Sequence, residues 1–272
     1  MKRLVADIGA TKAHWCVLEK GVPPRHVHTA GFNWAHTPVP QLQERIGDAV
    51  QEIGPGVDEV YFFAAGLTAA PSVDPGRWFP GARIEYASDL LGAARALFGR
   101  TAGVAAILGT GANTGSYDGE SLGWKVDCGG FIVGDEGSAA VLGKLFVADY
   151  IKACVPQEMA DAFAARYDAS YPALVRQIYA EGDPARFLGS LAPFVLSWYD
   201  RSDYARALVE GNFRAFFERS LKRYPPELPV GVVGAFGYAC RSILQEMGQA
   251  CGVPVVKFLK TPMEGLVAYY GL

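Results

Sequence analysis

The sequence predicts an α/β fold in two domains, and two observations carry this prediction. The chain has 272 residues, which fits two domains of roughly 100 to 150 residues better than one. Short apolar segments that end in glycine alternate with longer segments of helical apolar spacing, which is typical of α/β proteins. Two such domains should leave a cleft between them, where a small molecule can bind.

The first domain is expected over residues 1–101. Its opening apolar run ends at Gly9 and is followed by a second run rich in β-branched and aromatic residues, which predicts a hairpin with a glycine turn. A Gly-Pro-Gly segment marks the end of the first helix, and Ser88 is placed to cap the second. The predicted elements are strands at 3–8, 14–18, 27–32, 60–65 and 83–86, and helices at 41–53 and 89–98.

The second domain is expected over residues 102–272. A strand, a tight glycine turn and a return strand open it, and they resemble the first hairpin in topology although the two sequences barely match. After Gly137 the pattern becomes strongly helical, so this domain should be the one enriched in helices. The predicted elements are strands at 104–108, 114–117, 230–233 and 255–258, and helices at 139–153, 157–166, 171–180, 205–223 and 262–270.

Composition limits the partners. Half the residues are hydrophobic and 19% are charged, as in a folded globular enzyme, and the net charge is -3. Nothing in this balance favours nucleic acid or an anionic membrane, so a small-molecule substrate is expected. The apolar run at the N-terminus is too short for a signal peptide and is soon followed by polar residues. No apolar run in the sequence approaches the roughly 20 residues of a membrane span. We therefore expect a cytoplasmic protein.

The cysteines and histidines carry no metal-binding pattern. Five scattered cysteines without a CxxC pair are typical of reduced thiols in a cytosolic protein. All four histidines lie in the first 40 residues without metal-ligand spacing, and we interpret them as strand and loop residues. These histidines are His14, His26, His28 and His36.

The segment 7–12, with the sequence DIGATK, is the first candidate phosphate site. Gly9 at the hairpin tip lets backbone N–H groups approach phosphate oxygens, and the Thr11 hydroxyl can add a hydrogen bond. Asp7 can hold a hydrated Mg²⁺ that bridges the phosphates. We expect Lys12 to be a solvated residue of the hairpin that belongs to the ATP-binding site. We do not expect it to be catalytic. A plain Asp-Gly turn is the alternative interpretation of these six residues.

Two further motifs lie in the second domain. The turn Gly109-Thr110-Gly111 again connects two strands, and a second phosphate cradle would clamp ATP from the other side of the cleft. The run GDEGS, at 134–138, precedes a long helix. Its polar residues can cap that helix, and the Asp135 carboxylate beside Gly129 and Gly130 can accept hydrogen bonds from sugar hydroxyls.

The ordered set of DIGATK, SD before a helix, GTGAN, GDEGS and a late VVGAFG resembles the N-acetylglucosamine kinase and BadF/BadG-type ATPase family, within the actin, sugar kinase and Hsp70 superfamily. The resemblance spans nearly the whole chain. It implies a pair of ribonuclease-H-like, actin-like ATPase domains, with ATP, Mg²⁺ and an amino sugar in the central cleft. It also implies N-acetylglucosamine 6-phosphate as the product, and it is compatible with a homodimer.

The resemblance also implies roles for individual residues. Asp89 matches the base that takes the proton from the attacking hydroxyl, although it also suits the first turn of its helix. The ATP site is implied to comprise Asp7, Gly9, Thr11, Lys12, Gly109, Thr110, Gly111, Gly234 and Ala235. The sugar site is implied to comprise Asn33, Gly66, Asn113, Gly129, Gly130 and Asp135.

Alternatives remain for the acceptor and for the activity. The segment 129–133 is shorter than the corresponding segment in vertebrate-type members of the family, where it holds part of the site for the acetamido group. Another amino sugar, or a sugar with a larger substituent at its third carbon, is therefore an alternative acceptor. Cys128 keeps open an ATPase that activates a dehydratase through a shared iron–sulfur cluster. A non-catalytic nucleotide-binding sensor is the third interpretation, and it leaves the presence of Asp89 unexplained.

Overall fold

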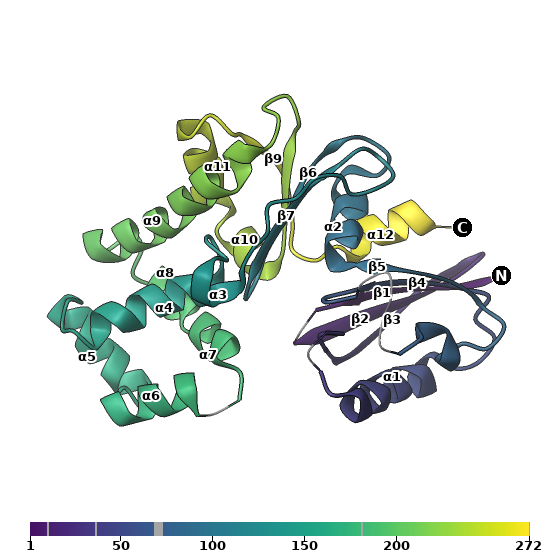
Figure 1. Cartoon of the computed structure of the whole chain (residues 1–272), viewed down its shortest axis with the longest axis horizontal. Coiled ribbons are helices and arrows are strands. Elements are labelled where there is room, and N and C mark those ends of the chain that lie inside the picture. The colour runs from purple at the N-terminus through teal and green to yellow at the C-terminus, as the bar shows by residue number, and fades with distance from the viewer. Residues whose placement is uncertain (10, 36, 68–72, 181, 272) are drawn as a thin grey trace. The chain divides into compact units, whose positions relative to one another are not determined.

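The computed structural model describes residues 1–9, 11–35, 37–67, 73–180 and 182–271. The chain divides into two compact units (Figure 1). Unit 1 comprises Met1–Ala105, Tyr117–Gly123 and Thr261–Leu272, and unit 2 comprises Ala106–Ser116 and Trp124–Lys260. These units differ from the predicted ranges 1–101 and 102–272 chiefly because the C-terminal segment returns to unit 1.

Unit 1 is built on a mixed five-stranded sheet with the order β3-β2-β1-β4-β5. The first three strands form an antiparallel meander, and β4 and β5 continue the sheet in parallel with β1. The carboxyl ends of β1, β4 and β5 therefore meet at one edge. The strands are β1 (Lys2–Ile8), β2 (Lys12–Glu19), β3 (Val22–Ala30), β4 (Glu59–Ala64) and β5 (Arg83–Ser88).

Helices cover both faces of this sheet (Figure 1). On one face, α1 (Val39–Ile53) buries an apolar stripe against a core that includes Trp15 and Phe62. On the other face lie α2 (Asp89–Phe98) and α12 (Met263–Tyr270), which pack against each other. A short 3₁₀ helix, Pro75–Trp78, precedes β5.

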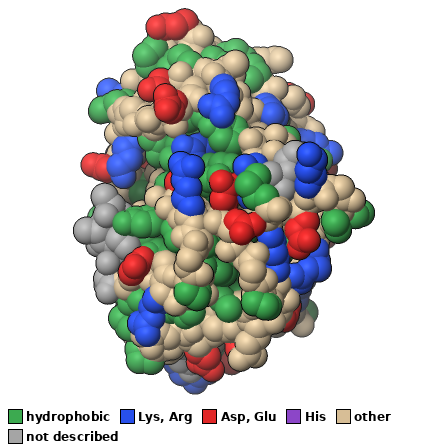
Figure 2. Space-filling view, turned by 90° about the vertical axis from the view of Figure 1, so that its right-hand side faces the viewer, with side chains coloured by type: hydrophobic (Ala, Val, Ile, Leu, Met, Phe, Trp, Pro, Cys, Tyr) green, Lys and Arg blue, Asp and Glu red, His purple; other side chains and the backbone are tan. Residues whose placement is uncertain are grey.

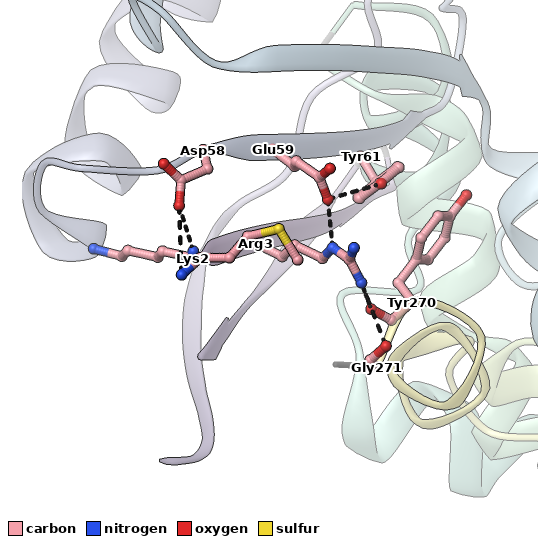
Figure 3. A network of polar contacts seen from close by, with 8 residues as sticks. Lys2, Arg3, Asp58, Glu59, Tyr61, Tyr270 and Gly271 are labelled. Atoms are coloured by element: carbon pink, nitrogen blue, oxygen red, sulfur yellow. Dashed lines mark hydrogen bonds and ion pairs between the residues drawn. The ribbon is translucent and has the colours of Figure 1, made fainter. Parts of the chain in front are cut away.

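Polar contacts attach the C-terminal helix to unit 1 (Figure 3). The Arg3 guanidinium donates to the backbone carbonyl of Tyr270 at 2.8 Å and forms an ion pair with Glu59. The Tyr61 hydroxyl donates to the same Glu59 carboxylate at 3.1 Å. The hydrogen bond from Arg3 is the main reason that the pKa of Glu59 lies below its usual value. These contacts explain why 261–272 belongs to unit 1.

Unit 2 holds most of a four-stranded sheet with the order β7-β6-β8-β9 and most of the helices. Three of its helices, α4, α5 and α8, pack through aromatic side chains, with ring centroids of Phe146 and Phe163 4.9 Å apart and those of Phe163 and Phe194 5.3 Å apart. The strands are β6 (Gly103–Leu108), β7 (Ala112–Tyr117), β8 (Val230–Val233) and β9 (Val255–Leu259). The helices are α3 (Gly130–Val133), α4 (Ala139–Tyr150), α5 (Gln157–Arg166), α6 (Tyr171–Tyr179), α7 (Pro184–Ser190), α8 (Ala192–Leu196), α9 (Asp203–Arg219), α10 (Ala235–Ala239) and α11 (Arg241–Ala250), with a 3₁₀ turn at Leu221–Arg223.

The predicted α/β class, the two sheets and the helical enrichment of the second half are confirmed. Ser88 caps α2 as predicted, since its hydroxyl accepts from the backbone N–H of Leu91. The strand predicted at 27–32 is wrong at its end, because β3 stops at Ala30, where the chain turns toward the loop after β1. The helices that were not predicted are α3, α7, α8, α10 and α11.

Charged side chains of both signs are interspersed with hydrophobic ones on the face shown in Figure 2. This mixture agrees with the small net charge of -3. Among the residues described, no helix has the length and apolar character needed to cross a bilayer.

Candidate active site

Unit 1 places two carboxylates at the edge where its parallel strands end. Asp7 is the penultimate residue of β1, and Asp89 begins α2 directly after β5. Burial, and after it the negative charge of Asp89, raises the pKa of Asp7 to about 7. Two carboxyl groups at one edge of the sheet offer the oxygen ligands that a cation such as Mg²⁺ prefers.

The turn after Asp7 is the predicted phosphate loop. Gly9 donates its backbone N–H to the Lys12 carbonyl at 3.0 Å, which closes the turn between β1 and β2. Thr11 and Lys12 are exposed at its tip. An exposed hydroxyl and ammonium on a tight backbone turn are groups that can donate to phosphate oxygens.

Asn33 lies beside this loop on the connection between β3 and α1. Its Oδ1 accepts from the backbone N–H of Ala35 at 2.9 Å, and its own N–H donates to the Thr37 hydroxyl at 3.0 Å. Gly66, which has a φ of 73°, packs so closely that a Cβ there would lie 2.2 Å from the Asn33 Oδ1. Only glycine therefore fits at position 66, and the two predicted sugar-site residues of unit 1 are neighbours.

In unit 2 the second glycine turn is anchored by the helix that follows GDEGS. Gly109 donates to the Gly111 carbonyl at 3.0 Å, which closes the turn between β6 and β7. The carbonyls of Gly109 and Thr110 accept from the first two N–H groups of α4, both at 3.0 Å. Ser138 is the cap of α4, so the capping role predicted for this run belongs to Ser138.

Asp135 lies against the same turn. Its φ is 56°, and its carboxyl accepts from the backbone N–H of Ala112 and from the Cys128 thiol. Burial raises the pKa of Asp135, and the Ala112 hydrogen bond opposes this effect. The Asn113 Oδ1 is buried without a partner in the described part of the chain, and the residue Asn113 lines a small cavity with Cys128 and Asp135. A buried acceptor that lacks a donor is a group that a ligand hydroxyl can satisfy.

The late glycine motif joins this cluster from the far end of the sequence. Gly234, between β8 and α10, has a φ of 127°, and a Cβ there would lie 2.3 Å from the Leu108 carbonyl oxygen. Its N–H donates to Leu259 at 3.0 Å. Gly234 and Ala235 therefore lie directly beside the strand that leads into the 109–111 turn. Gly129 and Gly130 both have a φ of 71° and begin the short helix α3 after Cys128.

The structure thus collects the predicted residues into one cluster in each unit. Unit 1 brings together Asp7, Gly9, Thr11, Lys12, Asn33, Gly66 and Asp89. Unit 2 brings together Gly109, Thr110, Gly111, Asn113, Gly129, Gly130, Asp135, Gly234 and Ala235.

Sequence reasoning missed Asn212, which supports the GDEGS turn. It is 2% exposed in α9, accepts from the Gly137 N–H at 2.9 Å and donates to the Ser138 carbonyl at 3.1 Å. The signal was available, because Asn212 falls on the apolar face of its helix, three residues after Val209 and one before Phe213.

The histidines form a cluster on β2 and β3. The His14 Nε2 and His26 Nδ1 atoms lie 2.9 Å apart, and the rings of His14 and His28 have centroids 4.1 Å apart. Burial lowers the pKa of His14 to about 4. Within the described ranges, no group of three or more His, Cys, Asp or Glu residues is arranged to hold a metal ion. His36 lies outside these ranges.

Solved structures of similar fold cover nearly the whole chain. The putative N-acetylglucosamine kinase of Porphyromonas gingivalis is 33% identical, with a TM-score of 0.88 over 98% of each chain. The putative N-acetylglucosamine kinase of Chromobacterium violaceum is 20% identical, with a TM-score of 0.75 over 98% of each chain. A ROK family glucokinase of Streptomyces griseus, solved with glucose and AMPPNP, shares the fold at 14% identity and a TM-score of 0.58, over 99% of this chain and 98% of that one.

No family model and no curated protein matches the sequence. The fold is that of sugar kinases with ribonuclease-H-like, actin-like ATPase domains. Within that class, the chain belongs to the family of the Porphyromonas gingivalis protein, with which it shares a third of its residues over nearly its full length.

Proposed function

We propose that the protein transfers the γ-phosphoryl group of ATP to the 6-hydroxyl of an N-acetylated hexosamine, with N-acetylglucosamine as the first candidate. The observation that carries this proposal is the pair formed by Asp7 and Asp89 at the carboxyl ends of β1 and β5. One carboxylate for the cation and one for the proton are what phosphoryl transfer to a hydroxyl requires.

In this proposal Asp89 accepts the proton of the sugar hydroxyl as that oxygen bonds to the γ-phosphorus and ADP leaves. Its Oδ1 is oriented by the backbone N–H of Leu90 at 2.9 Å. A carboxylate need not be a strong base here, because positioning and charge stabilisation supply most of the catalysis. Asp7 would hold Mg²⁺ through water, and the ion would neutralise charge on the phosphates.

The remaining residues bind and orient the two substrates. Thr11 and Lys12 on the first turn and Thr110 on the second are the proposed phosphate contacts, with Gly9, Gly109 and Gly111 shaping the turns. Gly234 is half-buried and Ala235 is exposed, and these two small residues are the proposed surface on which the adenine can lie. The proposed sugar contacts are Asn33, Gly66, Asn113, Gly129, Gly130 and Asp135.

The specific acceptor is inferred from two supports. One is the Porphyromonas gingivalis relative, which is named a putative N-acetylglucosamine kinase. The other is the pairing of an unsatisfied Asn113 oxygen with the Asp135 carboxyl, which suits a ligand rich in hydroxyl and amide donors. A homodimer and a cytoplasmic location belong to the same proposal.

The proposal is tested by coupled ADP release with Mg-ATP and a panel of N-acetylglucosamine, N-acetylmannosamine, N-acetylmuramic acid, glucosamine and glucose. One N-acetylated sugar should stimulate release strongly, and Asp89→Asn should reduce kcat on the order of a hundredfold or more with the nucleotide affinity retained. Release without any sugar dependence, together with bound iron, would instead support the dehydratase activator.

A further inference from the structure

The connection between β3 and α1 is packed against the first phosphate loop without any side chain between them. Gly31 is buried, and a Cβ on it would lie 2.2 Å from both the Gly9 carbonyl oxygen and the Lys12 nitrogen. The two backbones are therefore in direct contact. A displacement of the chain at Gly31 must displace the loop at Gly9 and Lys12, because close-packed backbone leaves no room to absorb it.

The same connection is fixed on its other side to the end of β4. Trp34 donates its N–H to the Ala65 carbonyl at 2.8 Å, and Ala65 donates to the Ile8 carbonyl at 2.9 Å. Asn33, between these contacts, packs its Oδ1 against Gly66. One short segment of backbone thus touches the phosphate loop at Gly31 and presents the proposed sugar contact two residues later.

Arg45 holds this segment from α1. Its half-buried guanidinium donates through Nη1 to the Gly31 carbonyl. A charged donor on a backbone carbonyl is among the stronger hydrogen bonds in proteins. Arg45 lies on the helix that carries the core residues Leu42 and Ile46, so the carbonyl is tied to a rigid element.

We propose that Arg45 is a positioning residue that couples the phosphate loop to the sugar contact Asn33, so that nucleotide and sugar each strengthen binding of the other. The inference rests on the proposed function for the role of the loop in nucleotide binding and for the role of Asn33 in sugar binding. Arg45 reaches neither substrate in this account. It fixes the carbonyl of Gly31, and the backbone at Gly31 in turn limits the motion of the phosphate loop and of Asn33. The entropy lost when these two segments become ordered on ligand binding is therefore smaller.

Arg25 supplies a matched control. It also donates its guanidinium to backbone carbonyls, those of Glu52 at 3.0 Å and Ile53 at 2.7 Å. It ties β3 to the same helix, but at the far end of α1 and away from the phosphate loop. Arg45→Ala and Arg25→Ala therefore remove equivalent contacts, and only the first touches the proposed coupling.

The experiment is calorimetric titration of Mg-AMPPNP into each variant, without sugar and with saturating N-acetylglucosamine. Wild-type protein should bind the nucleotide at least about fivefold more tightly with sugar present. Arg45→Ala should weaken nucleotide binding on the order of 3- to 10-fold without sugar and reduce the sugar-dependent gain to less than about twofold. Arg45→Lys, which keeps one charged donor, should recover part of both effects.

Thermal unfolding of all variants shows whether each is folded at the titration temperature, and the Gly31→Ala variant tests directly the contact between Gly31 and the loop. The proposal is overturned if Arg45→Ala matches wild type in both titrations or if Arg25→Ala shows an equal loss. If no sugar in the panel proves to be an acceptor, the sugar-free titration still decides the positioning role, because it compares Arg45→Ala with Arg25→Ala on the nucleotide alone.

Discussion

Asp7 belongs to the candidate site, and its pKa differs clearly from that of an exposed aspartate. Burial first, and Asp89 second, raises its pKa from 3.8 to about 7. The folded protein therefore holds a proton on Asp7 that the unfolded chain releases near pH 4. Because the folded state binds this proton more tightly, the contribution of Asp7 to stability is full below about pH 4 and is lost as pH rises to about 7.

This linkage predicts the behaviour of Asp7→Asn. The variant cannot ionise at this position, so its stability relative to wild type should increase by about 1 to 3 kcal/mol between pH 5 and pH 8. Urea unfolding in buffer with a chelator measures the difference at each pH. Asp127→Asn, at a side chain that is 90% exposed, provides the control for the same substitution at the surface. A pH-independent effect of Asp7→Asn would contradict the assigned burial.

At the scale of elements, α12 is fitted closely to α2. Gly265 lies in α12, and a Cβ there would come within 2.4 Å of the Ala96 carbonyl oxygen and 2.6 Å of its Cα. Arg95 of α2 forms hydrogen bonds with Glu85 and with the Tyr270 hydroxyl. The C-terminal helix thus completes unit 1 by close backbone packing as well as by the Arg3 contacts.

Substitution by alanine should have opposite effects on the stability of the protein at two helical glycines of unit 1. Gly265→Ala should destabilise the protein by about 1 to 3 kcal/mol, because the new methyl group meets backbone that cannot move cheaply. Gly47→Ala in α1 should stabilise it by up to about 1 kcal/mol, because no atom lies within 4 Å and alanine favours helix. Chemical denaturation of both variants measures the difference, and equal effects would contradict the packing of α12 on α2.

At the scale of the whole molecule, the sequence predicted local elements better than long-range contacts. The hairpins, the capped helix α2 and the GDEGS run depend on neighbouring residues, so their patterns are visible in the sequence. The contact of Gly31 with the loop at Gly9, the bonds from Asn212 to Gly137 and Ser138, and the return of α12 to unit 1 join residues that are distant along the chain. Spacing alone carries no information about such pairs.

The same distinction applies to the candidate site. Asp7, Asn33, Asp89, Asn113 and Asp135 were predicted because motif order identifies them, and the structure gathers them into a cluster in each unit. The residues that support them were not predicted, since Arg45 and Asn212 belong to helices without a motif. Their roles follow only from the hydrogen bonds that the fold creates.

The measurement that most directly tests the central claim is ³¹P NMR of N-acetylglucosamine with Mg-ATP and the protein. We expect a growing phosphomonoester signal coupled to the two protons of carbon 6, with ADP formed in equal amount, and with both products formed on the order of a hundredfold or more slowly by Asp89→Asn. Release of inorganic phosphate alone, or an unchanged ATP spectrum with every sugar of the panel, would contradict the assignment of a sugar kinase that acts on an N-acetylated hexosamine.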